Sequence, residues 1–167
     1  MDESKTKGYF LAATAAGQND VARLEKHLRS LLRPGQRRIH FTSESDSSRR
    51  TLLAALAGLE LHVVVYCVRG VPDKIARARC LTALLDDLVD SRAQHVILER
   101  DESVEAKDRE IILAALRHRR DRSVTYGHAA AHEHPLLWVS DVVAWCCYRG
   151  GDWLRRARPM IADIQRL

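Results

Sequence analysis

The segment 135–148 is almost wholly apolar, and Asp141 is its only charged residue. Pro135 suits the first turn of a helix, because the N–H that proline lacks would be unpaired there in any case. Gly150 and Gly151 are typical of a helix end. The apolar run is shorter than the roughly 20 residues that cross a bilayer, so the sequence predicts a buried core helix over 135–149. A carboxylate on such a helix is costly unless it meets a partner, a metal ion or water, and this requirement constrains what can surround Asp141.

Apolar spacing along the rest of the chain predicts alternating strands and helices. Strands are expected at 9–16, 38–42, 61–68, 95–99 and 123–128, and helices at 20–32, 45–59, 72–90, 104–120 and 153–167. Residues 1–4 are a short candidate hairpin partner for the first of these strands. For a chain of 167 residues this order predicts a single domain over 1–167. Its expected class is α/β, with three layers in which helices flank a mixed central sheet.

The composition favours a partner that carries negative charge. The formal net charge of +5 at pH 7 favours a polyanion such as DNA or RNA, while an aromatic content of 5% argues against a platform that stacks bases. No run of residues reads as a membrane span or a signal peptide, so no membrane partner is expected. The four cysteines form no Cys-x-x-Cys pair, which is typical of buried free thiols in the cytoplasm.

Acidic residues at three places in the chain are candidates for a metal site. They are Asp2 with Glu3 at the start, Glu99 with Asp101 where a buried strand ends, and Asp141 on the core helix. Carboxylates at strand ends and on a packed helix can converge on one edge of a sheet. Hard oxygen ligands with few competing imidazoles suit Mg²⁺ or Mn²⁺. Two such ions about 4 Å apart activate water and stabilise the leaving oxygen in phosphodiester cleavage.

Each acidic position also has a structural interpretation. Asp2 and Glu3 fit a solvated terminus, and Asp101 fits a loop acid or a helix cap. A buried ion pair would satisfy Asp141 without any catalysis. Its candidate arginine partners are Arg49, Arg100 and Arg149.

Four short motifs occur in an order that is typical of one family. The chain opens with Met1–Ser4 (MDES), a middle strand ends in Ile97–Asp101 (ILERD), and Pro135–Leu137 (PLL) precedes Asp141 by about one helical turn. A His-Phe pair at 40–41 comes before an Arg-Arg pair at 49–50. In order and spacing, over almost the whole chain, these motifs resemble the family called domain of unknown function 3800.

The resemblance implies an RNase H-like fold and a divalent-metal-dependent nuclease or related phosphoryl-transfer enzyme that acts on nucleic acid. It implies Mg²⁺ or Mn²⁺ as the cofactor, held by Asp2, Glu99 and Asp141, with Asp101 and Glu3 as alternative catalytic acids. The alternative is a non-catalytic nucleic-acid-binding or regulatory module that keeps the fold and has lost the metal site. A third hypothesis is an interaction subunit that associates with itself through exposed helices.

Arginines supply candidate contacts to nucleic-acid phosphates. They are Arg38, Arg49, Arg50, Arg100, Arg117, Arg119 and Arg120. The last three have a second interpretation, because cations at the end of the helix predicted over 104–120 complement the helix dipole.

Histidines near the acids are candidates for proton transfer near neutral pH. We assign this role to His40 and His134. His128, His132 and His134 have the spacing H-x-x-x-H-x-H, and three imidazoles at such a spacing can instead hold Zn²⁺.

Overall fold

The computed structural model describes residues 8–167, which form five strands and six α-helices. The strands are β1 (Tyr9–Ala15), β2 (His62–Val68), β3 (His95–Glu99), β4 (Thr125–Ala129) and β5 (Ile161–Arg166). The helices are α1 (Val21–Ser30), α2 (Asp46–Ala57), α3 (Asp73–Asp90), α4 (Glu105–Arg119), α5 (Leu136–Arg149) and α6 (Gly151–Ala157). Most of the predicted elements are thereby confirmed to within a few residues. The predicted hairpin partner at 1–4 lies outside the described residues.

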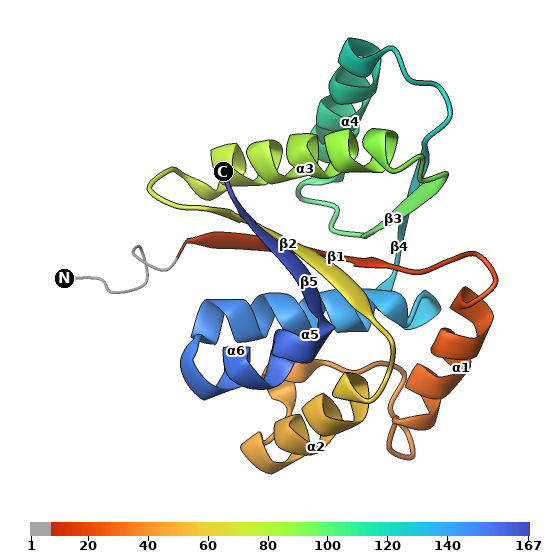
Figure 1. The fold of residues 1–167 in the computed structure, drawn as a ribbon, viewed down its shortest axis with the longest axis vertical. Coiled ribbons are helices and arrows are strands. Elements are labelled where there is room, and N and C mark those ends of the chain that lie inside the picture. The colour runs from red at the N-terminus through yellow and green to blue at the C-terminus, as the bar shows by residue number, and fades with distance from the viewer. Residues whose placement is uncertain (1–7) are drawn as a thin grey trace.

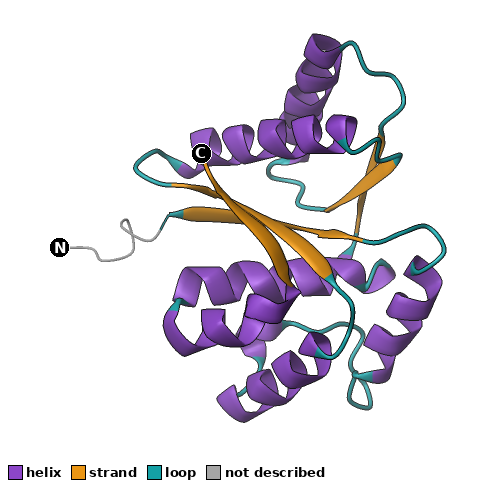
Figure 2. Cartoon of the chain, in the orientation of Figure 1, coloured by secondary structure: helices purple, strands orange, loops and turns teal. Residues whose placement is uncertain are grey.

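The strands form two sheets. In the first, β1 pairs antiparallel with β2 and β2 pairs parallel with β5, so that this three-stranded sheet is mixed. In the second, β3 and β4 form a parallel pair in which Glu99 lies opposite Ala129. Figure 2 shows both sheets between two groups of helices.

Helices cover both sides of the sheets. Helices α3 and α4 lie on one side, whereas α1, α2, α5 and α6 lie on the other (Figure 1). The strand alternation matches these two layers: Tyr9 and Leu11 pack with the apolar cluster under α3 and α4, while Phe10 and Ala12 pack with the cluster around α5. The predicted α/β class with a mixed sheet and flanking helices is confirmed, with two sheets in place of one.

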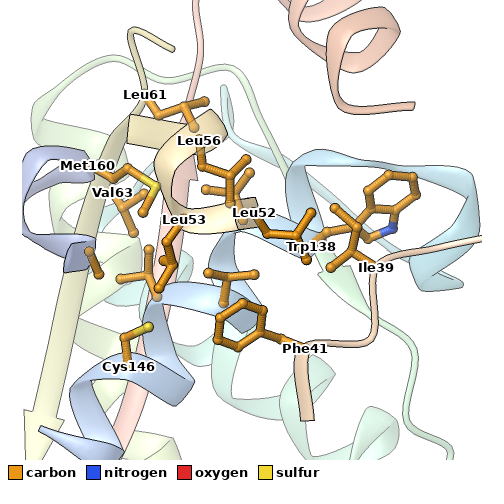
Figure 3. Packing of buried hydrophobic residues seen from close by; sticks show 14 of the residues in the cluster. Ile39, Phe41, Leu52, Leu53, Leu56, Leu61, Val63, Trp138, Cys146 and Met160 are labelled. Carbon is orange, nitrogen blue, oxygen red and sulfur yellow. The ribbon is translucent and has the colours of Figure 1, made fainter. Parts of the chain in front are cut away.

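Helix α5 is the centre of the larger apolar cluster. Its residues Val139, Val142 and Cys146 are fully buried, and Figure 3 shows Cys146 beside Leu53 of α2. Because this core is made by residues from four helices, the position of α5 against β1 is tightly determined. All four cysteines are buried and free, as predicted.

Two predicted elements are wrong. Residues 38–42 do not form a strand; the chain turns there into a short 3₁₀ helix, η2 (Phe41–Ser43), whose Phe41 is buried against α5. The helix predicted over 153–167 ends at Ala157, because Pro159 cannot supply a helical N–H. The chain then enters β5, and pairing with β2 overrides the helical spacing of its apolar residues.

Across residues 8–167, no helix has the length and apolar character needed to cross a membrane.

Candidate functional site

Glu99 is the last residue of β3 and lies on the face of its sheet that is turned toward α5. Its neighbour Leu98 is buried in the apolar cluster under α3 and α4, and successive side chains of a strand point to opposite faces. Glu99 therefore points away from that cluster, and its side chain is 48% exposed. The prediction that a carboxylate ends this strand is confirmed.

Asp141 lies in the second turn of α5 and is half-buried. The residue before it, Ser140, has its hydroxyl 2.8 Å from the hydroxyl of Thr14, which ties this turn of the helix to β1. The backbone N–H of Phe41 donates a hydrogen bond to the Asp141 carboxylate. The turn around 39–41 thus closes over the carboxylate in place of the strand that the sequence predicted.

The pKa of Asp141 is raised above its ordinary value. Burial is the main cause and the negative charge of Glu99 adds to it, whereas the charges of His40 and Arg38 and the Phe41 hydrogen bond oppose the rise. The structure therefore brings Glu99 and Asp141, 42 positions apart in the sequence, within range of each other's charge. Two ionised carboxylates close together repel each other, and this repulsion costs free energy when one of them is half-buried.

Arg38 and His40 border this acidic pair. The Nη1 atom of Arg38 donates to Oε1 of Glu99 at 3.1 Å, and Nδ1 of His40 lies 3.1 Å from the Ser43 hydroxyl. Both residues precede η2, so the irregular segment that replaces the predicted strand carries the basic partners of the site.

The donor set of the acidic pair fits Mg²⁺ or Mn²⁺ in part. Mg²⁺ is commonly held by one or two carboxylates, and waters and substrate phosphates complete its shell. Glu99 and Asp141 supply two carboxylates of this kind. Within residues 8–167 there is no group of three or more metal-ligating side chains, and the predicted ligands Asp2 and Glu3 lie outside the described residues.

Asp101 does not join the acidic pair. It is exposed, and its Oδ1 accepts hydrogen bonds from the backbone N–H and the hydroxyl of Ser103, at 3.0 and 2.7 Å. These bonds hold the pKa of Asp101 below its ordinary value. Asp101 thus shapes the turn before α4, which is the structural interpretation that the sequence left open.

The arginines proposed as partners of Asp141 are engaged elsewhere. Arg49 donates to Asp46 and to the backbone carbonyls of Phe41 and Thr42, at 2.7, 3.0 and 2.7 Å. Arg100 donates to the His128 carbonyl at 3.2 Å, and Arg149 lies over the ring of Trp145. None of the three forms an ion pair with Asp141 within the part of the chain that the structure describes.

The basic end of α4 is remote from the acidic pair. Figure 1 shows the C-terminal end of α4 projecting beyond α3, on the side of the sheets opposite α5. Arg119 forms ion pairs with Asp86 and Asp90 of α3, and Arg117 and Arg120 are exposed. These arginines and those around η2 therefore lie on different parts of the surface.

The three histidines near α5 do not converge. His134 lies with its Nδ1 3.7 Å from Glu25 of α1, His132 is exposed, and the His128 side chain is buried on the α4 side of β4. The zinc alternative therefore has no three-histidine group in the described structure. Of the two predicted proton-transfer residues, His40 is the one whose charge acts on Asp141.

A buried ion pair between Arg77 of α3 and Asp108 of α4 was not predicted from the sequence. Asp108 is fully buried and accepts two bonds from Arg77, Nε to Oδ1 at 2.7 Å and Nη2 to Oδ2 at 2.6 Å. Arg77 also donates to the Tyr9 hydroxyl at 2.9 Å, and Nε2 of His128 lies 3.7 Å from the same carboxylate. Asp108 shares a helix face with the buried Ile112, and this spacing is the signal that could have predicted its burial.

Comparison of the chain with models of protein families, with curated proteins and with solved structures found no match.

Proposed function

We propose that the chain is a divalent-metal-dependent nuclease or related phosphoryl-transfer enzyme with an RNase H-like fold, similar to the family called domain of unknown function 3800. The observation that carries the proposal is that two carboxylates from separate elements, Glu99 and Asp141, lie close enough for the charge of Glu99 to raise the pKa of Asp141. Helices on both sides of a mixed sheet and a basic chain are consistent with it.

The electrostatics of the pair favour a bound cation. Burial and the charge of Glu99 both raise the pKa of Asp141, so the ionised pair is under repulsion that a divalent ion would relieve. Mg²⁺ or Mn²⁺ supplies, when bound, activation of water and stabilisation of the leaving oxygen in phosphodiester cleavage. Glu99 and Asp141 would hold the ion, and Asp2 is the candidate third ligand.

The basic residues around the pair have distinct roles in this proposal. Arg38, which is paired with Glu99, is placed to bind a phosphate oxygen beside the acidic pair. His40 lies within electrostatic reach of Asp141 and is the candidate residue for proton transfer. The partner is DNA or RNA, bound through its phosphates.

Titration of Mn²⁺ by calorimetry tests the metal site. The wild type is compared with Asp141→Asn and Glu99→Gln, and Asp163→Asn is the control because this exposed aspartate lies on β5, beyond β2 from β1. We expect saturable binding in the wild type and in the control, and its loss in both site variants. Binding that persists in Asp141→Asn would contradict the proposed site.

Cleavage of labelled DNA and RNA oligonucleotides with Mn²⁺, and with a chelator in its place, tests the activity. One observation favours the non-catalytic nucleic-acid-binding module as a second candidate: Arg38 forms an ion pair with Glu99 and so balances its charge. That candidate predicts oligonucleotide binding with no cleavage in any divalent ion and no difference between Asp141→Asn and the wild type.

A further inference from the structure

Arg50 and Arg149 are exposed cations that lie over tryptophan rings. The guanidinium carbon of Arg149 is 5.4 Å from the centre of the Trp145 ring, and that of Arg50 is 5.5 Å from the centre of the Trp153 ring. The two rings meet edge to face with their centres 5.5 Å apart. The two arginines therefore occupy one continuous surface made by α2, α5 and α6.

Neither guanidinium is neutralised by an acidic residue of the described chain. Asp46, one turn before Arg50 on α2, is bound by Arg49 at 2.7 Å. Asp152, which follows Arg149 closely in the chain, accepts from Arg155 and from Arg156, the latter at 2.7 Å. Because the nearby acids are taken by other arginines, Arg50 and Arg149 are left as excess positive charge on this surface.

A tryptophan ring lies under each of these two cations. A guanidinium that stacks on an aromatic ring keeps its flat face covered and its N–H groups directed outward along its edge. Such an edge matches the oxygens of a phosphate, and less side-chain entropy is lost on binding because the group is already positioned. The geometry thus suits an anion with paired oxygens, and the net charge of +5 favours the phosphates of a polyanion.

We propose that Arg50 and Arg149 form a phosphate-binding platform for one strand of a nucleic acid. This inference rests on the proposed nucleic-acid function and names the surface along which the strand lies. Asp141, Trp145 and Arg149 recur at four-residue intervals on α5 and share one face of the helix. The platform therefore continues from the acidic pair, and Arg149 is about 12 Å along the helix from Asp141.

Binding of a fluorescein-labelled oligothymidylate, measured by anisotropy in a chelator at several salt concentrations, tests the platform. The double variant Arg50→Gln/Arg149→Gln is compared with the wild type. Two surface charge contacts predict an affinity about 5- to 30-fold weaker. The slope of log K against log salt should become less steep by about 1.4, because each contact to a single strand contributes about 0.7.

The matched control is Arg79→Gln/Arg109→Gln, which removes the same net charge from exposed residues of α3 and α4. We expect it to retain the wild-type slope. Arg50→Lys/Arg149→Lys keeps both charges and should also retain the slope, and thermal melts of all variants check that they fold. The proposal would be overturned if the wild type and the Gln double variant had equal salt slopes. It would also be overturned if the control variant lost as much affinity and slope as the Gln double variant.

The chelator separates this inference from the proposed function. Loss of strand binding in the Gln double variant supports the platform whether or not Mn²⁺ binds to Asp141. Metal-dependent cleavage with wild-type strand binding in the same variant would keep the nuclease and reject the platform.

Discussion

The Nη1 atom of Arg38 lies 3.1 Å from the Oε1 atom of Glu99, so the carboxylate that acts on Asp141 is itself held by a cation. Both side chains are partly exposed, at 37% and 48%, and an ion pair of this kind contributes little to stability. Its more important effect is on the site, because Arg38 brings a positive charge to a carboxylate that is proposed to hold a metal ion.

Replacement of Arg38 by Met is expected to tighten Mn²⁺ binding. Removal of a positive charge from the acidic pair lowers the electrostatic cost of adding a divalent ion, and an affinity gain of about 3- to 10-fold is expected at low salt. Calorimetric titration measures it, with Arg109→Met of α4 as the control for net charge. Weaker binding in Arg38→Met would show that Arg38 holds Glu99 in position for the ion.

Replacement of Asp141 by Asn is expected to stabilise the metal-free protein at neutral pH. The pKa of Asp141 is raised by burial and by Glu99, so its ionised form costs folding free energy once the pH exceeds the folded pKa. Asn removes that charge and can still accept from the Phe41 N–H. The melting temperature should rise without metal, and added Mn²⁺ should raise it in the wild type but not in the variant.

A lower melting temperature for Asp141→Asn without metal would mean that the carboxylate is a net stabilising partner of Arg38 and His40. Asp163→Asn, at an exposed position on β5, is the control. It shows how far the melting temperature moves when an exposed aspartate loses its charge.

Replacement of Asp108 by Asn is expected to destabilise the protein by about 2–4 kcal/mol. The variant leaves Arg77 half-buried without its anion, and breaking one partner of a buried pair is strongly destabilising. Urea unfolding measures the loss. Asp90→Asn removes an exposed partner of Arg119 and should cost less than about 1 kcal/mol; similar losses in the two variants would argue against a special role for the buried pair.

Most of the fold could be predicted because its elements are determined by local spacing. The β-branched run of β2 and the apolar run of α5 are such cases, and both lie where the sequence placed them. The strand β5 was missed because its short, half-exposed sequence becomes a strand only through its pairing with β2. The strand predicted over residues 38–42 is wrong for the opposite reason: apolar and polar residues alternate there, yet no strand in the described structure pairs with them.

Of the candidate site, only the acidic residues could be predicted from the sequence, and not their arrangement. Glu99 at a strand end and Asp141 on an apolar helix are visible in the sequence, whereas their proximity depends on how α5 packs against β1. The Arg38–Glu99 pair spans 61 positions and arises from an irregular segment, for which no periodicity exists. Long-range ion pairs of this kind follow from tertiary structure and leave no local pattern.

Glu44 is expected to govern part of the acid sensitivity of folding. Its side chain is only 4% exposed; burial alone would raise the pKa of Glu44, but hydrogen bonds from Ser48 and Gln36 and the charge of Arg33 outweigh it and leave the pKa below its ordinary value. Ser48 donates at 2.6 Å and Gln36 at 3.0 Å. These contacts stabilise the folded state only while Glu44 is ionised.

The sign of the pH effect follows from the lowered pKa. The stabilisation is fully present above the ordinary carboxyl pKa of about 4.3 and is lost as the pH falls through the lower folded value. Glu44→Gln should therefore cost about 1–3 kcal/mol near neutral pH, and its difference from the wild type should shrink as the pH falls from about 5 toward 3. Urea unfolding over this range measures the difference, and Glu110→Gln, an exposed glutamate of α4, should show little change. A constant difference across the range would show that Glu44 acts through its shape and packing, because only its charge titrates.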